Sequence, residues 1–205
     1  FLPSSAGVRL RITVRTATIA EAEARLRDVE AKIRAQAEKY IYAIDDTELE
    51  EVVGTLLAEK KLSLAVAESC TGGLIADRIT NISGSSNYFE RGIISYSNES
   101  KTQELHVPEN LIQQYGAVSK EVAEAMAEGI RKTSGVNIGI STTGIAGPTG
   151  ATQEKPIGLV WIGYSDAKST FAIKFIFNGE RRIVKERAAQ AALELLRRKL
   201  LNISL

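Results

Sequence analysis

Histidine, cysteine and methionine each occur only once in this chain, as His106, Cys70 and Met126. A single cysteine excludes disulfides within the chain and fits a reducing, cytoplasmic setting. One histidine and one cysteine cannot build a zinc site of the usual His/Cys type, so no metal is expected. A serine–histidine–aspartate triad would have to use His106, which we interpret as a surface or capping residue.

The sequence also lacks a charge excess and a long apolar run. Lysine and arginine number 26 against 25 acidic residues, and the formal net charge is +1. This balance gives no support for a nucleic-acid or membrane surface, and no stretch approaches the ~20 apolar residues that span a bilayer. The 205 residues suit one domain plus a small appendage. Because the chain does not begin with methionine, we expect a fragment or processed product.

Two regions of different pattern follow one another. Residues 8–15 alternate as a half-buried strand does, residues 20–38 place apolar side chains on one helix face, and residues 40–44 indicate a second strand. We predict a small β-α-β domain over residues 1–45 that depends on a neighbour or on absent chain, because it is too short for its own core.

Strands and helices alternate over residues 46–205, where Thr47 and Glu50 indicate a capping box for the first helix. Expected strands follow near residues 62–67, 92–97, 136–142, 158–165 and 169–177, with helices between them and a long helix at the end. This order predicts an α/β fold, a three-layer α/β/α sandwich with helices on both faces of a mixed sheet.

The most informative segment is residues 61–76, where an apolar run leads through Glu68, Ser69, Cys70 and Thr71 into two glycines and a helical pattern. Such a junction points backbone N–H groups at one spot, and a serine there is a nucleophile beside an oxyanion or phosphate site. Ser69 and Thr71 are explained equally well as helix caps. Cys70 is a rival nucleophile, but only one of two adjacent residues in a turn can face the pocket.

Three loops with unusual residues, 68–73, 96–101 and 142–150, each follow an apolar strand. We predict that they converge on one crevice, because ligands of α/β sheets bind at the carboxyl ends of the strands. Lys101 would lie in the first turn of a helix capped by Asn98, where the helix dipole and burial lower its pKa toward the ~7–8 of a general base. The alternative is a solvated lysine.

Each of the other candidate site residues can also be explained by a structural or surface role. Tyr96 is either a site residue or a core residue. The 142–150 loop is rich in glycine, but it matches neither a Walker loop nor a dinucleotide fingerprint. Arg181 and Arg182 open the last helix, where they either clamp a phosphate or are solvated.

Four motif blocks, taken together and in order, resemble the CinA C-terminal family, the nicotinamide-nucleotide amidohydrolases. The blocks are AESCTGG at 67–73, FERG with YSNESK at 89–101, GAVS at 116–119, and TGIAGPTG with KPIG at 143–158. The match runs from about Thr47 to Leu200. The preceding residues are similar to the KH-type middle domain of full-length CinA proteins, which also carry an N-terminal molybdopterin-binding-like domain. The natural protein is therefore expected to carry that domain too.

The resemblance implies hydrolysis of the carboxamide of nicotinamide mononucleotide to nicotinate mononucleotide and ammonia, in pyridine nucleotide recycling. It implies a serine mechanism without metal or cofactor, in a homodimer, with Ser69, Tyr96 and Lys101 as the catalytic residues by motif position. Ala151 departs from the pattern, since the family often has a second glycine there. No Gly-x-x-Gly loop precedes Thr47, so RNA binding is not expected.

As a hypothesis, Ser69 attacks the amide after losing its proton to Lys101, directly or through Tyr96. The N–H groups of residues 70–73 would hold the oxyanion, and Glu68 would orient Lys101 or the turn. The substrate-binding residues are expected to be Cys70, Thr71, Gly72, Gly84, Thr143, Ile145 and Arg181. Two competing hypotheses are a non-catalytic pyridine-nucleotide-binding regulatory module and an interaction protein linked to competence or DNA damage.

Overall fold

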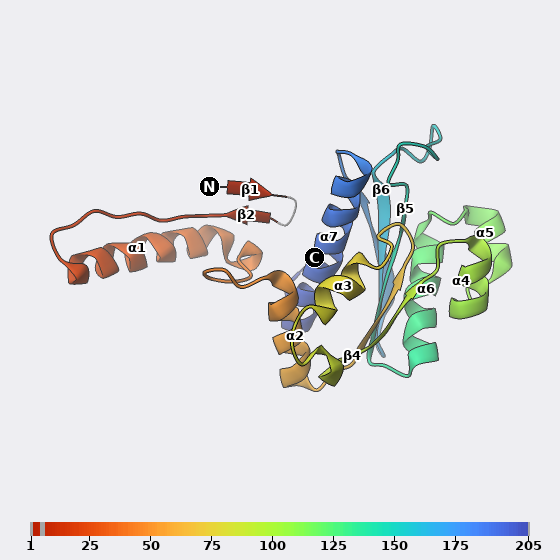
Figure 1. Ribbon diagram of the computed structural model, residues 1–205, viewed down its shortest axis with the longest axis horizontal. Coiled ribbons are helices and arrows are strands. Elements are labelled where there is room, and N and C mark those ends of the chain that lie inside the picture. Colours follow the sequence, from red (N-terminus) through yellow and green to blue (C-terminus); the bar gives the residue numbers. More distant parts are fainter. Residues whose placement is uncertain (1, 5–6, 205) are drawn as a thin grey trace.

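The structure is a computed structural model that describes residues 2–4 and 7–204. It consists of a layered α/β body and an elongated N-terminal arm that extends from one side of it (Figure 1). The expected strand and helix order is largely confirmed in the body and only partly in the arm.

The main sheet of the described chain has five strands in the order β4-β3-β5-β6-β7. At its centre, β3 (Leu64–Glu68) lies parallel to β4 (Phe89–Ile94) on one side and to β5 (Ile138–Gly144) on the other. The next two strands, β6 (Leu159–Ser165) and β7 (Thr170–Ile176), continue the sheet in antiparallel pairing. The predicted mixed sheet is confirmed.

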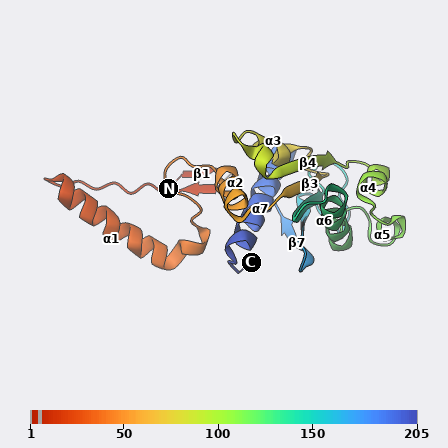
Figure 2. The same cartoon turned by 90° about the horizontal axis from the view of Figure 1, so that it is seen from below.

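Helices cover both faces of this sheet (Figure 2). One face carries α2 (Leu49–Lys60), α3 (Leu74–Thr80) and α7 (Arg181–Leu201), and the other carries α6 (Lys120–Ser134), against which α4 (Asn98–Leu105) and α5 (Glu109–Tyr115) pack. Each face has its own apolar core. The three-layer sandwich is therefore confirmed. Among the described residues, no helix is long and apolar enough to cross a membrane.

The capping box predicted at the start of α2 does not form. Its N-cap is Glu48 rather than Thr47, and no side chain caps it. The Glu50 carboxylate cannot reach back to the cap because it is bound by Arg78 of α3, with Nη2–Oε2 at 2.6 Å. A contact between helices thus overrides a local sequence signal.

The N-terminal arm contains a short hairpin of β1 (Leu2–Ser4) and β2 (Gly7–Arg9), an extended segment, and α1 (Ile19–Ala37). The predicted helix is confirmed. The strand predicted over residues 8–15 forms only in its first part, and none forms over residues 40–44, which follow a 3-10 turn at Glu38–Tyr40. Residues 10–15 alternate and residues 40–44 are apolar, but neither segment has a neighbouring strand in the described chain, and a strand exists only when a ladder pairs it.

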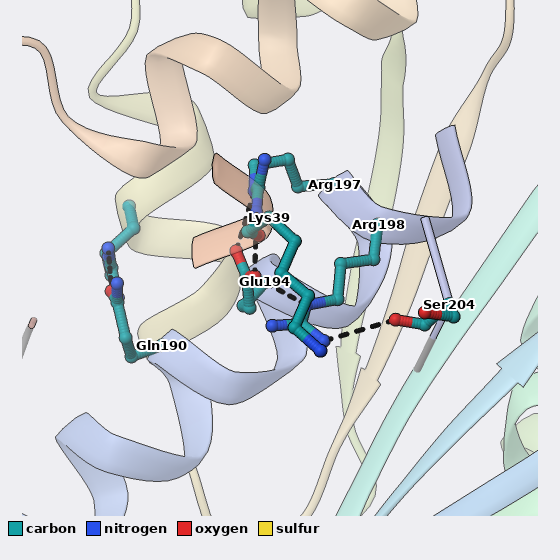
Figure 3. A network of polar contacts seen from close by, with 7 residues as sticks. Lys39, Gln190, Glu194, Arg197, Arg198 and Ser204 are labelled. Atoms are coloured by element: carbon teal, nitrogen blue, oxygen red, sulfur yellow. Dashed lines mark hydrogen bonds and ion pairs between the residues drawn. The ribbon is translucent and has the colours of Figure 1, made fainter. Parts of the chain in front are cut away.

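A polar network joins the arm to the body near the end of α7 (Figure 3). The Arg197 guanidinium, almost fully buried, forms a bidentate pair with Glu194 and donates to the backbone carbonyl of Lys39 at 2.7 Å. Arg198 binds the same carboxylate at 2.7 Å and lies over the ring of Tyr40. This contact anchors the arm where it enters the body.

Candidate active site

Three loops meet at the carboxyl edge of the parallel strands. Ser69 directly follows β3, and its N–H donates to the carbonyl of Thr142 in β5 at 2.9 Å. The hydroxyls of Thr71 and Thr142 are 2.7 Å apart. Lys101, from the first turns of α4 after β4, reaches Ser69 with its amine. These contacts bring the three loops together at one edge of the sheet.

Lys101 is buried, with 1% of its surface exposed. Its Nζ lies 3.2 Å from Ser69 Oγ, 2.8 Å from the carbonyl oxygen of Ser95 and 3.4 Å from that of Tyr96. None of these acceptors is a carboxylate, so burial, opposed only in part by the interaction with Cys70, lowers the pKa of Lys101 to about 8. About a tenth of the amine is then neutral at pH 7, far more than for an exposed lysine, and a general base must be neutral to accept a proton.

The helix that carries Lys101 is capped one residue earlier than predicted. Ser97, not Asn98, is the N-cap of α4, and its Oγ accepts the N–H of Ser100 at 3.0 Å. Lys101 is then the fourth helical residue, and its own N–H donates to the Ser97 carbonyl. The lowered pKa is therefore a consequence of burial rather than of an exposed helix N-terminus.

The Glu68 carboxylate holds the turn between β3 and α3. It accepts the N–H groups of Gly73 at 3.0 Å, Ile75 at 3.2 Å and Ala76 at 2.9 Å. The Gly73 N–H is thereby occupied, which corrects the expectation that it holds an oxyanion. The N–H groups of Thr71 and Gly72 bind no acceptor within the described chain.

Cys70 and Thr71 turn their side chains inward. Burial raises the pKa of the Cys70 thiol to about 12, so the sulfur is protonated and enclosed. The Thr71 hydroxyl is bound to Thr142, and Thr71 is fully buried. Of the residues expected to bind substrate in this loop, these two therefore offer backbone rather than side-chain groups.

Tyr96 is exposed, with 60% of its surface accessible, and its hydroxyl accepts a hydrogen bond from Arg181 Nη2 at 2.7 Å. Arg181 Nη1 donates to the carbonyl of Gly147 at 2.8 Å. Arg181 therefore joins the β4 and β5 loops, whereas Arg182 points away and pairs with Glu186 at 2.8 Å. Within the described residues, the Tyr96 hydroxyl makes no hydrogen bond to Ser69 or Lys101.

A pocket of about 380 Å³ opens beside this arginine. Its lining comes from the β5 loop, the β6 approach and the start of α7, namely Ala146, Gly147, Pro148, Ile157, Gly179, Glu180 and Arg181. The Ser69–Lys101 pair is not part of that lining. Arg181 links the two, because it lines the pocket and binds the loop that carries Tyr96.

Three of the expected nucleotide-lining residues are placed differently. Thr143 is buried and gives its hydroxyl to the carbonyl of Ala117 at 2.7 Å. Ile145 is partly buried, and its N–H continues the pairing with β6. Gly84 lies ahead of the amino end of β4, at the opposite edge of the sheet from Ser69. Within one chain, Gly84 therefore does not lie at the edge of the sheet where Ser69 and Lys101 meet.

The sequence reasoning missed Lys185. It lies one turn after Arg181 in α7, and a Cβ built on Gly72 would be 3.4 Å from its Nζ. The available signal was the spacing of four residues from Arg181, which places two side chains on one helix face.

Fold and site define an α/β protein with a buried serine–lysine pair at the carboxyl edge of parallel strands. The family model described as the CinA C-terminal domain matches residues 46–200, and the model described as the damage-inducible protein CinA KH domain matches residues 1–43. The chain belongs to the CinA family.

Individual relatives agree with this assignment. A protein of Caldicellulosiruptor saccharolyticus that is named as a competence-damage inducible protein is 52% identical over 195 residues, which are 95% of this chain and 47% of the relative. A CinA-like protein of Syntrophus aciditrophicus is 50% identical over 199 residues, 97% of this chain and 47% of the relative. The chain thus spans about half the length of these curated relatives.

The solved structures that resemble this chain belong to the same family. The competence/damage inducible protein CihA of Agrobacterium tumefaciens has a TM-score of 0.70 and 34% identity, covering 75% of this chain and 96% of its own. A CinA superfamily protein of Klebsiella pneumoniae has a TM-score of 0.73 and 28% identity, with coverages of 75% and 96%.

Proposed function

We propose that this protein hydrolyses the carboxamide of nicotinamide mononucleotide, releasing ammonia and nicotinate mononucleotide. The observation that carries the proposal is the buried contact of 3.2 Å between Lys101 Nζ and Ser69 Oγ. A lysine whose pKa is about 8 can accept the serine proton near neutral pH, which an ordinary lysine cannot do. The chain needs no histidine for this chemistry.

In the first half of the reaction, Ser69 Oγ attacks the amide carbon and its proton passes to Lys101 Nζ. The carbonyl oxygen becomes an oxyanion, for which the free N–H groups of Thr71 and Gly72 are the available donors. A well-placed donor of this kind contributes about 10²- to 10³-fold in rate. The Gly72 backbone, with φ of +63°, is in a conformation that suits glycine.

In the second half, the protonated Lys101 gives its proton to the departing nitrogen, which leaves as ammonia, and Ser69 remains as an ester of the substrate acyl group. Water then attacks the ester, and Lys101 takes a proton from that water. The ester bond breaks, the acid is released and Ser69 recovers its proton from Lys101. The direct contact makes a relay through Tyr96 unnecessary, so we propose that Tyr96 holds Arg181 instead.

Ammonia release from nicotinamide mononucleotide tests the proposal. Ser69→Ala should lower the rate by about 10³-fold or more, because the covalent route is lost. Ser83→Ala, at an exposed serine before β4, is the matched control. Undiminished release in Ser69→Ala would rule out the nucleophile. Binding of the mononucleotide without any ammonia in the unmodified protein would favour a regulatory binding module.

A further inference from the structure

A buried hydroxyl beside the Ser69–Lys101 pair has no hydrogen-bond partner in the described chain. Three buried side-chain oxygens of the described residues make no hydrogen bond, those of Tyr88, Ser95 and Ser134. Ser95 is fully buried, and its backbone carbonyl accepts the Lys101 amine at 2.8 Å. A buried hydroxyl without a partner costs free energy in the folded protein, so one that lies next to the reacting groups needs an explanation.

The sheet places the Ser95 side chain on the same face as that of Ser69. Ala67 pairs with Ile93 in the parallel ladder of β3 and β4, and both pack into the apolar core that α4 and α6 cover. Ser69 and Ser95 each lie two residues further along their strands, and side chains two residues apart point to the same face. The Ser95 hydroxyl is therefore on the face from which Lys101 of α4 approaches.

The contacts of the Lys101 amine suit the resting site, in which Ser69 still carries a hydroxyl. A charged lysine has three N–H groups to donate and no acceptor. Three oxygens can receive them, Ser69 Oγ at 3.2 Å, the Ser95 carbonyl at 2.8 Å and the Tyr96 carbonyl at 3.4 Å. When Ser69 Oγ bonds to the amide carbon, it becomes a weaker acceptor at the moment when Lys101 gains its charge. The new ammonium therefore loses one of its three acceptors.

We propose that Ser95 is a positioning residue of the amidohydrolase reaction, whose hydroxyl accepts an N–H of charged Lys101 once Ser69 is bonded to the substrate. The hydroxyl and the carbonyl that already binds the amine belong to one residue, so rotation about the Ser95 Cα–Cβ bond can bring Oγ toward Nζ. The proton stays on Lys101, and Ser95 forms no covalent bond. The inference rests on the proposed function, because it concerns the charged lysine that the attack of Ser69 creates.

The Ser95 hydroxyl should then contribute to the transition state and not to substrate binding. The loss of one hydrogen bond to a charged group corresponds to about a 10- to 100-fold loss in rate. Ser95→Ala should lower kcat for ammonia release from nicotinamide mononucleotide by this factor and leave KM nearly unchanged. The pH midpoint of kcat/KM should stay near 8, where the pKa of Lys101 places it, because the resting amine does not use this hydroxyl. Ser95→Thr keeps the hydroxyl and should recover most of the loss.

Ser134→Ala is the matched control. Ser134 is the last residue of α6, ahead of the amino end of β5 and so at the opposite edge of the sheet, and its buried hydroxyl also lacks a partner in the described chain. Its removal should leave kcat unchanged. Both alanine variants should unfold at the same urea concentration as wild type or at a higher one, because a buried hydroxyl without a partner does not stabilise the fold.

An undiminished kcat in Ser95→Ala would overturn the inference, and so would a Ser95→Thr variant as slow as Ser95→Ala. A shifted pH midpoint or unfolding at a lower urea concentration in Ser95→Ala would also overturn it. In those cases the hydroxyl would act on the resting lysine or on the fold.

Labelling with phenylmethanesulfonyl fluoride tests Ser95 without the proposed amide substrate. Ser69 Oγ attacks the sulfur, the S–F bond breaks, fluoride leaves and the serine proton passes to Lys101, so this reaction creates the same charged lysine. Labelling should be about 10- to 100-fold slower in Ser95→Ala and unchanged in Ser134→Ala, with Ser69→Ala as the background. If wild type is labelled but releases no ammonia, the proposed function fails and the labelling rates decide on Ser95. If wild type is neither labelled nor active, Ser69 is not a nucleophile and both proposals fail.

Discussion

Replacing the buried amine of Lys101 should remove activity and, at neutral pH, stabilise the fold. Burial lowers the pKa of Lys101 to about 8 in the folded protein from the ordinary 10.5 of an exposed lysine. The unfolded chain therefore binds more protons than the folded one between these two values. Folding stability must rise as pH increases through this window, and the full penalty is present below pH 8.

The size of the effect follows from the two pKa values. Their difference corresponds to about 3 kcal/mol of destabilisation at pH 7. Lys101→Met removes that penalty and keeps an unbranched side chain, but it also removes the hydrogen bonds to Ser69 and Ser95, each of net value about 1 kcal/mol. We expect Lys101→Met to be more stable than wild type by about 1 kcal/mol at pH 7.

The sign of this stability difference should reverse at alkaline pH, where Lys101→Met should be the less stable protein. Near pH 10 most of the penalty has disappeared from the wild type, while the lost hydrogen bonds still weaken the variant. The difference between the two proteins should change by about 2 to 3 kcal/mol from pH 7 to pH 10. Urea unfolding of both proteins at several pH values measures it.

A matched control separates this effect from general alkaline weakening. Lys168→Met, in the exposed turn between β6 and β7, removes an amine from solvent. If the difference between Lys101→Met and wild type is the same at pH 7 and pH 10, burial does not perturb this amine. The Ser69–Lys101 mechanism would then lose its physical basis.

The rate of ammonia release should rise about tenfold per pH unit below pH 8 and level off above it, because only neutral Lys101 accepts the Ser69 proton; a profile flat from pH 6 to 9 would contradict this. Cys70→Ala should keep activity within a few fold, and iodoacetamide should leave the native enzyme active, since burial holds the thiol protonated; rapid inactivation would contradict the assignment. Gly129→Ala should destabilise the protein by about 1 to 3 kcal/mol in urea, although alanine favours helices, because its Cβ would overlap the Leu105 carbonyl of α4; a more stable variant would contradict this packing.

The body of the fold could be predicted because its signals are local. The apolar run before Ser69 and the glycines after it dictate a strand, a turn and a helix within a few residues. Three parallel strands then bring their loops to one edge, so the Ser69–Lys101 contact follows from topology. The Ser119 cap of α6 is equally local, because its Oγ accepts the N–H of Val122, three residues further on.

The two local predictions that are wrong, and the missed Lys185, concern residues whose partners are distant in sequence. Glu50 matches a capping box but binds Arg78, which no local pattern reveals. Lys185 reaches Gly72 because packing sets the rotation of α7 about its own axis. Residues 40–44 form an apolar run suited to a strand, yet a strand needs a neighbour that the described chain does not supply.

Glu68 and Lys101 are both buried near Ser69, but they do not form an ion pair with each other. This separation explains why the site can hold a neutral lysine. A carboxylate beside Lys101 would stabilise its charged form and raise its pKa. Glu68 is adjacent to Ser69 in sequence, but three N–H groups at the start of α3 bind both of its oxygens, and no ion pair joins it to Lys101 in the described structure. The hydrogen-bond acceptors of the amine are all neutral, so burial is the largest influence on its pKa and only the interaction with Cys70 opposes it. The turn that carries Ser69 therefore also keeps Lys101 without an acidic partner, because the N–H groups at the start of α3 bind the carboxylate of Glu68.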